Sequence, residues 1–216
     1  MLRIERLDVS IQAIGILRGV NMEVPTGKFV GLIGRNGAGK TTLMRAIMGI
    51  LPAPQGSIVF DGSTLAKTPT HQRARNGIGY MPEDRRLVPQ LTVEENVLIP
   101  AWSAGVADPR ARLAAIYNMI PEVEQFAGRK ALQLSGGQQK LVALARALMC
   151  GTKLLLLDEP FEGVAPVLAR RLADVISGLK QQGLSIILTE SDLSHSEDML
   201  DLIYTIDRGQ VSTAGV

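Results

Sequence analysis

The chain has 216 residues, of which 46% are hydrophobic and 20% are charged, and its formal net charge at pH 7 is only +2. A chain of this length buries roughly 70% of its extended surface in a compact domain, so neither disulfides nor a metal cluster is needed for folding. The basic residues are scattered and nearly balanced by acidic ones, which argues against a nucleic-acid partner.

Two features of the sequence bear on location. The single cysteine, Cys150, cannot form an internal disulfide, and the charged N-terminus with Arg3, Glu5 and Arg6 is unlike a secretion signal. The longest weakly polar run, residues 97–107, is about half of the roughly 20 residues that a membrane-spanning helix needs. We therefore expect a cytosolic chain without a membrane span.

The N-terminal part of the sequence predicts strands before its first helix. Leu2, Ile4 and Leu7 roughly alternate with charged residues, and the segments GVNMEVP and KFVGLIG follow with a turn between them. This pattern predicts an antiparallel opening. A helix is expected from Gly39, with its end near Gly49 to Pro52, and the segments GSIVFDG and NGIGYMP predict two short strands after it.

The region from Leu91 to Cys150 predicts helices, and strands alternate with helices after it. Thr92 with Glu95 fits a capping box, and Asp108 before a proline fits an N-cap. The sequence then predicts a strand in KLLLLDE, a helix over about 166–182, a strand in LSIILTE, a short helix after Asp192 and a strand in LIYTIDRG. This alternation predicts a parallel sheet with both faces covered.

Together these elements predict an α/β fold in a single domain, residues 1–216. A mostly parallel sheet would carry an antiparallel N-terminal portion, with residues 1–87 and 151–216 forming the core. Residues 88–150 would form a helical insertion.

A glycine-rich loop follows the predicted strand FVGLI and opens a helix. Its residues GRNGAGKT fit the phosphate-binding pattern G-x-x-x-x-G-K-[ST]. Glycines are required because backbone N–H groups must curl around phosphate oxygens, and the helix N-terminus adds favourable partial charge. Lys40 is expected to reach the β- and γ-phosphates, and the Thr41 hydroxyl is expected to bind Mg²⁺.

Two acidic residues, Asp158 and Glu159, end the apolar run KLLLL. Such a run predicts a strand buried on both faces, and in parallel sheets ligands bind beyond the carboxyl ends of the strands. Asp158 would hold Mg²⁺ through water, and Glu159 would orient or deprotonate the attacking water. For this string alone, a buried strand followed by an acidic turn without function is the alternative.

A second glycine pair occurs in LQLSGGQQK, residues 132–140. Ser135 and Gln138 fit a capping box at the start of a helix. The capping box does not account for Gly136 and Gly137 in the first turn, where each glycine costs up to about 1 kcal/mol relative to alanine. A helix start with free N–H groups, a hydroxyl and no side-chain bulk predicts a second anion site.

The strings GRNGAGKTT, LSGGQQ and LLLLDEP, in that order and spacing, resemble the ATP-binding subunits of ABC transporters over essentially the whole chain. The resemblance implies a P-loop NTPase core, ATP and Mg²⁺ as cofactors, ATP hydrolysis, and two subunits that meet head to tail around two nucleotides. It implies ATP binding in cis by Gly34, Arg35, Asn36, Gly37, Ala38, Gly39, Lys40, Thr41 and Thr42, and in trans by Ser135, Gly136, Gly137 and Gln138. The metal ligands would be Thr41, Glu83 and Asp158, and the catalytic residues Glu159 and Ser191.

The stretch RARNGIGYMPEDRRLVPQLTVEENVL and the string DEPFEGVAP are similar to the ATPases of importers for branched-chain amino acids and for urea or short amides. This resemblance implies a second ATPase subunit, membrane permeases and, indirectly, a periplasmic solute-binding protein as partners. It also implies a place on the cytoplasmic face of a bacterial inner membrane, with the permease near residues 83–100.

Three positions depart from the family's pattern. Glu83 stands where most ABC ATPases have glutamine; a carboxylate can still bind Mg²⁺ but cannot donate an amide hydrogen bond. Ser191 stands where many have histidine; its hydroxyl can donate to the γ-phosphate but cannot carry a charge, and we expect the nearby His195 at the surface. The segment 208–216 stands where many relatives continue into a further helix.

Other classes share parts of this pattern. P-loop ATPases of DNA repair carry the same three motifs, but the interval between Lys40 and Asp158 here holds neither the heptads nor the cysteine cluster found in them. GTPase switches and kinases have no LSGGQ element. A subunit that binds ATP but turns it over slowly, because of Glu83 and Ser191, stays open as an alternative.

The sequence also predicts weak discrimination between ATP and GTP. No aromatic residue precedes Phe29, so the family's aromatic platform for adenine is missing, and Ile11 or Ile14 is expected to pack there instead. Aromatic stacking typically contributes about 0.5–1.5 kcal/mol beyond area burial. We expect ATP and GTP to compete equally in a binding assay. A preference of about a hundredfold for ATP, or roughly 2.7 kcal/mol, would contradict this.

Overall fold

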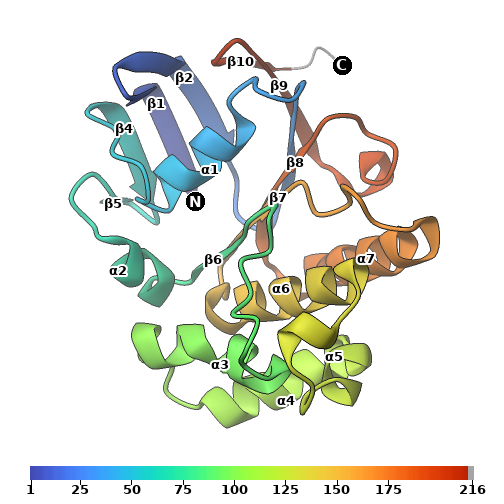
Figure 1. Cartoon of the computed structure of the whole chain (residues 1–216). Helices are drawn as coiled ribbons and strands as arrows, with labels where there is room; N and C mark the ends of the chain where they lie inside the picture. Colours follow the sequence, from blue (N-terminus) through green and yellow to red (C-terminus); the bar gives the residue numbers. More distant parts are fainter. Residues whose placement is uncertain (214–216) are drawn as a thin grey trace.

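The computed structural model describes residues 1–213, which form two sheets and a set of helices that cover the larger one (Figure 1). Residues 214–216, at the end of the segment 208–216, lie outside the described residues. No helix among residues 1–213 combines the length and the apolar character that a membrane crossing requires.

The smaller sheet is antiparallel and has the strand order β2-β1-β4-β5. Its strands are β1 (Leu2–Ile11), β2 (Ile14–Val24), β4 (Gln55–Phe60) and β5 (Ser63–Thr64). The register shifts around Arg6, whose φ is 46°, so that Leu7 and Val9 are buried like Leu2 and Ile4 before it. The predicted antiparallel opening is therefore confirmed for the first two strands.

The larger sheet has the order β10-β9-β3-β8-β7-β6 and is parallel except for the pair β10-β9. Its strands are β3 (Phe29–Ile33), β6 (Ile78–Met81), β7 (Leu154–Asp158), β8 (Ser185–Glu190), β9 (Leu202–Asp207) and β10 (Gln210–Thr213). The segment KFVGLIG was expected to continue the antiparallel opening, and this was wrong. Phe29 and Val30 are fully buried, which suits a strand covered on both faces.

Helices and single turns connect the strands. They are α1 (Lys40–Ile47), α2 (Thr70–Arg75), α3 (Val93–Ala104), α4 (Pro109–Met119), α5 (Pro121–Gln125), η1 (Ala131–Gln133), α6 (Gly136–Cys150), α7 (Pro166–Leu179), η2 (Lys180–Gln182) and η3 (Glu197–Met199). The predicted caps are confirmed, because Thr92 and Asp108 accept hydrogen bonds from the first turns of α3 and α4. Helix α2 and strand β10 were not predicted, and the short helix after Asp192 is one 3₁₀ turn.

The core has two parts, one on each face of the larger sheet. Leu154 and Leu156 of β7 pack toward α1 and the smaller sheet, whereas Leu155 and Leu157 pack toward α3 to α7 (Figure 1). An unbroken leucine run thus fills both parts, as expected for a central parallel strand.

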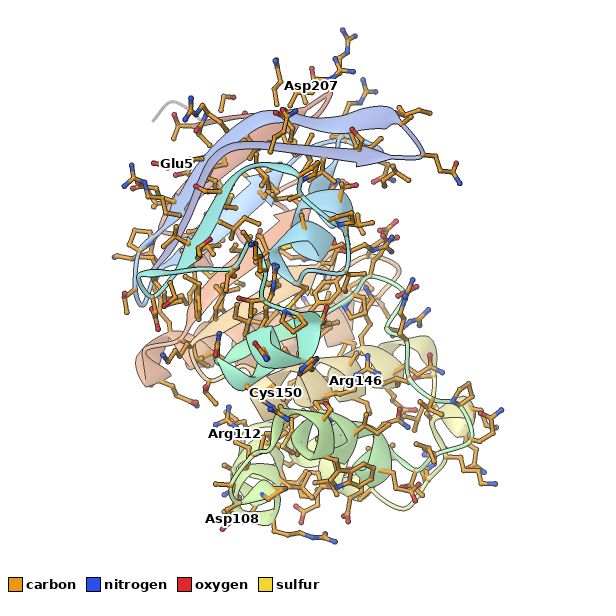
Figure 2. The ribbon with its side chains drawn as sticks, turned by 90° about the vertical axis from the view of Figure 1, so that its left-hand side faces the viewer. Glu5, Asp108, Arg112, Arg146, Cys150 and Asp207 are labelled. Carbon is orange, nitrogen blue, oxygen red and sulfur yellow. The ribbon has the colours of Figure 1, made fainter. Side chains whose placement is uncertain are left out.

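The helices between β6 and β7 attach to the sheet through α6. Figure 2 shows Arg112, Arg146 and Cys150 close together where these helices meet the α/β part. Arg112 of α4 donates from Nη2 to the carbonyl oxygen of Leu148 over 2.7 Å, near the end of α6. Cationic donors at a helix C-terminus satisfy carbonyls that have no partner within the helix.

Gly79 of β6 offers a test of this packing. An added Cβ would lie 2.2 Å from the carbonyl oxygen of Ala147 and 2.8 Å from Leu155 Cδ2. We predict that Gly79→Ala lowers the free energy of unfolding by about 2 kcal/mol, within the usual range for overpacking. Urea unfolding measures the change.

Gly178→Ala is the control. Gly178 lies in α7, and its added Cβ would meet nothing within 4 Å. Alanine should stabilise that helix by up to about 1 kcal/mol. Equal stabilities of the two variants would contradict the close approach of β6 and α6.

Candidate functional site

The glycine-rich loop joins β3 to α1 and wraps around Lys40. Gly37 and Gly39 have φ values of 81° and 116°, a backbone conformation that residues with a side chain rarely adopt. The Lys40 side chain is 5% exposed, and its Nζ donates to the carbonyl oxygens of Gly34 and Arg35. The first N–H groups of α1 therefore face the loop without a capping side chain, as an anion site requires.

Asp158 is fully buried at the end of β7 and is held by three hydroxyl groups. Its Oδ1 accepts from Thr41 Oγ1 at 3.2 Å and from Thr189 Oγ1 at 2.9 Å. Its Oδ2 accepts from the Tyr80 hydroxyl at 3.2 Å. Burial raises the pKa of Asp158, and the three hydroxyl donors oppose that rise because they stabilise the carboxylate.

Glu159 has a strained backbone conformation, and hydrogen bonds hold both its N–H and its carbonyl group. Its φ is 48°, which is uncommon for a residue with a side chain. Its N–H donates to the carbonyl and the hydroxyl of Thr189, and its carbonyl accepts from the buried Nζ of Lys140 over 2.6 Å. Strained backbone conformations that are held by their surroundings cluster at functional sites.

The Glu159 side chain meets the glycine-rich loop. Its Oε1 forms an ion pair with Lys40 Nζ at 2.8 Å, and both side chains are buried. Ser191 Oγ lies 3.3 Å from the same oxygen and 3.0 Å from Asn36 Oδ1. The structure thus brings the predicted residues Glu159 and Ser191 together with two loop residues.

One cavity of about 460 Å³ joins several residues of the glycine-rich loop to Glu159. It is lined by Ile16, Asn36, Gly37, Gly39, Lys40, Thr41, Thr42, Glu83 and Glu159. The apolar residue here is Ile16, whereas Ile11 and Ile14 are 38% and 66% exposed at the β1–β2 turn. The expectation that Ile11 or Ile14 packs against adenine stays a prediction.

The oxygens of this region suit a hard cation. Desolvation, followed by the charges of Glu162, Asp158 and Glu159, raises the pKa of Glu83. Within residues 1–213 no group of three or more His, Cys, Asp or Glu side chains has the geometry of a metal site. Mg²⁺ is commonly held by one or two carboxylates together with substrate phosphates, and the hydroxyl of Thr41 beside Asp158 fits that donor set.

The second glycine pair opens α6 and forms the predicted capping box. Ser135 Oγ accepts from the Gln138 N–H at 3.3 Å, and Gln138 Oε1 accepts from the Ser135 N–H at 3.0 Å. Ser135 and Gly136 are exposed. Part of the need for glycine comes from packing within the chain, because a Cβ on Gly137 would lie 1.9 Å from Leu168 of α7.

Three polar residues of the site were not predicted. Tyr80 and Thr189 lie within the strands on either side of β7, and Lys140 lies in the apolar face of α6, where it is 3% exposed. A lysine inside an apolar helical pattern was the one available signal. His195 is exposed as expected, with its ring 5.4 Å from that of Phe161.

Comparisons with known proteins agree with this geometry. The family model described as "ABC transporter" matches residues 17–162. The high-affinity branched-chain amino acid transport ATP-binding protein BraG of Pseudomonas aeruginosa is 33% identical over 211 residues, covering 98% of this chain and 91% of BraG. The lipopolysaccharide export system ATP-binding protein LptB of Haemophilus influenzae is 32% identical over 217 residues, covering 100% and 90%.

Solved structures give the same result. A nucleotide-free ATP-binding cassette from an ABC transporter has a TM-score of 0.88 and 29% identity, covering 100% of this chain and 90% of that one. The dimeric structure of a bacterial ABC transporter cassette, MJ0796, has a TM-score of 0.88 and 25% identity, covering 100% of both chains.

Glu190, which precedes Ser191, makes the stability of the folded chain depend on pH. It is 6% exposed and accepts a hydrogen bond from Ser196 Oγ. Burial raises the pKa of Glu190 from 4.5 to about 7, with the charges of Asp192 and Glu159 adding to the rise. The folded state therefore binds this proton more tightly than the unfolded state does, so stability falls as the pH rises from about 4.5 to 7.

We predict that Glu190→Gln removes this dependence and keeps the bond to Ser196. Relative to the parent, the variant should gain up to about 3 kcal/mol of unfolding free energy between pH 4.5 and 8, as measured by urea unfolding. Glu197→Gln, at an exposed position, is the control. A difference between Glu190→Gln and the parent that does not change with pH would contradict the prediction.

Proposed function

Because the chain belongs to the ABC transporter family of ATP-hydrolysing proteins, we propose that it is the nucleotide-binding subunit of a bacterial membrane importer. Two such subunits, identical or paralogous, would meet head to tail. Each ATP would lie between the glycine-rich loop of one subunit and the start of α6 in the other. The subunits would sit on the cytoplasmic face of the membrane, against permease subunits.

The observation that carries this proposal is the exposed start of α6. The Ser135 hydroxyl and the backbone of Gly136 are exposed at the N-terminus of the helix, where an anion is favoured. The cavity around the chain's own phosphate loop is lined by other residues. A second subunit would supply the missing wall, and the similarity to a dimeric cassette supports this.

The same geometry suggests how the subunit hydrolyses ATP. Lys40 is paired with Glu159 at 2.8 Å, and the phosphates of ATP would compete for its ammonium group. Glu159, released from that pair, would accept the proton of the attacking water. Gly34 to Thr42 would hold the phosphates. When bound, Mg²⁺ would neutralise phosphate charge, with Thr41, Asp158 and Glu83 as its protein ligands.

The two departures from the family pattern fit this mechanism. Ser191 lies within hydrogen-bonding distance of both Asn36 and Glu159, so it can orient the carboxylate although it carries no charge. Glu83 lines the same cavity as Lys40 and Thr41, and its carboxylate can still bind Mg²⁺ there. We therefore propose an active ATPase rather than a binding-only subunit.

A second surface suits the permease. A groove of about 330 Å³ runs between α1, α2, β6, α3 and α6. It is lined by Arg45, Met48, Ile50, Thr70, Ala74, Ile78, Gly79, Tyr80, Pro82, Arg86, Ile99, Pro100, Ser103, Arg146, Ala147 and Cys150. Arg146, labelled in Figure 2, lies where the helices meet the α/β part. The described lining thus has three arginines and no acidic residue.

We propose that an amphipathic helical segment of the permease, bearing at least one carboxylate, docks in this cationic groove. Charge complementarity supports that occupant, because Arg45, Arg86 and Arg146 belong to an otherwise mostly apolar lining. Branched-chain amino acids, or a related amide, are the proposed cargo, in view of BraG and of LivF from Archaeoglobus fulgidus. Export is the second candidate because LptB is comparably similar. The membrane proteins that co-purify with the chain will distinguish import, with an associated periplasmic solute-binding protein, from export.

A mixing experiment tests the head-to-tail arrangement. Lys40→Met removes the cis phosphate contact and Ser135→Arg blocks the trans site, so each variant alone should release almost no phosphate. A mixed dimer keeps one complete site. Mixing should therefore restore up to about a quarter of the parental rate of phosphate release, because random pairing makes half of the dimers mixed.

The control mixes Lys40→Met with Thr41→Ala. Both changes lie in the cis loop, so no mixed dimer has a complete site and no activity should return. Restoration in this control, or none in the first mixture once crosslinking has shown mixed dimers, would contradict the proposal.

A further inference from the structure

We propose that Tyr80 is a positioning residue that relays occupancy of the cationic groove to the carboxylate of Asp158. The relay rests on the proposed function, in which the permease fills the groove. The hydrogen bond between Tyr80 and Asp158 is present in this chain and does not depend on the proposed function.

Tyr80 is partly buried and contacts both the groove and Asp158. Its side chain lines the groove together with Arg45 and Pro82. Its hydroxyl donates to Asp158 Oδ2 over 3.2 Å. Asp158 itself is fully buried and reaches Thr41 at the start of α1 through Oδ1. A single side chain thus separates the groove from the carboxylate next to the phosphate loop.

The strand register explains why Tyr80 can span this distance. Tyr80 of β6 pairs with Leu156 of β7, and the two residues face the same side of the sheet. Asp158 lies two residues further along β7 and therefore faces that side as well. The aromatic ring of Tyr80 carries the hydroxyl diagonally across to Asp158.

The hydrogen bonds of Asp158 show what Tyr80 contributes. Thr41 and Thr189 donate to Oδ1, whereas the Tyr80 hydroxyl donates to Oδ2. The three donors together hold both oxygens of the carboxylate in one orientation. Without the Tyr80 hydroxyl, Oδ2 would lose this donor, and the carboxylate would be less well oriented toward a metal ion beside Thr41.

The first experiment deletes the hydroxyl and keeps the ring. Mn²⁺ binding to the purified chain, in the presence of a non-hydrolysable ATP analogue, is followed by electron paramagnetic resonance. We expect Tyr80→Phe to raise the half-saturating Mn²⁺ concentration by about three- to tenfold, as for the loss of one hydrogen bond of typical strength. Affinity for the analogue without metal should stay unchanged.

Tyr117→Phe is the matched control. The Tyr117 hydroxyl donates to Glu94 Oε2 at 3.4 Å, which is the same pair of chemical groups within the α3–α4 region. This variant should bind Mn²⁺ like the parent. If Tyr80→Phe also binds Mn²⁺ like the parent, Tyr80 does not position Asp158 and the proposal is wrong.

The second experiment fills the groove. Ser103 lines the groove and is exposed, whereas Cys150, also in the lining, is buried. Ser103→Cys in a Cys150→Ala background, labelled with a bulky maleimide, places a large group in the cationic groove. The label should shift the half-saturating Mn²⁺ concentration when Tyr80 is present and should have no effect when Tyr80→Phe is added.

A label that shifts both proteins equally, or neither, would overturn the relay. Neither experiment needs a permease or a dimer. Failure to co-purify a permease would therefore count against the proposed function alone, whereas an unchanged Mn²⁺ affinity in Tyr80→Phe would count against the relay alone.

Discussion

The buried carboxylate of Asp158, held by hydroxyls from three elements, is the constraint on which the rest of the site depends. A carboxylate is costly to bury unless hydrogen bonds replace its hydration, and Thr41, Tyr80 and Thr189 supply them from α1, β6 and β8. Those donors meet only because three strands run parallel in one register. A shift of one residue in β7 would turn the carboxylate to the opposite face of the sheet.

Much of this arrangement could be predicted from local patterns. The loop from Gly34 to Thr42, the caps at Thr92 and Ser135, and the leucine run before Asp158 each carry their information within a few neighbouring residues. The position of FVGLI was predicted wrongly, because which strands pair depends on contacts between distant segments. Strand β10 and helix α2 were missed because they are short and weakly patterned.

The polar residues that complete the site were harder to predict, since their partners are far away in the chain. Tyr80 and Asp158 are 78 positions apart, and Lys140 reaches a backbone carbonyl rather than another side chain. The glycines of α6 show a related difficulty. From the sequence we attributed both glycines to an anion that approaches the backbone. In the structure, Leu168 of α7 already occupies the space beside Gly137. Internal packing and a ligand site favour the same residue, so the sequence pattern does not distinguish them.

One consequence follows from the way α6 begins. Its first turn carries the two glycines, and Lys140, one turn further on, donates to the carbonyl of Glu159. A helix is stiff over such a short distance, so these two points move together. A displacement of the first turn of α6 would therefore shift the backbone that orients Glu159. In a dimer, the nucleotide bound by one subunit would in this way affect the orientation of Glu159 in the other.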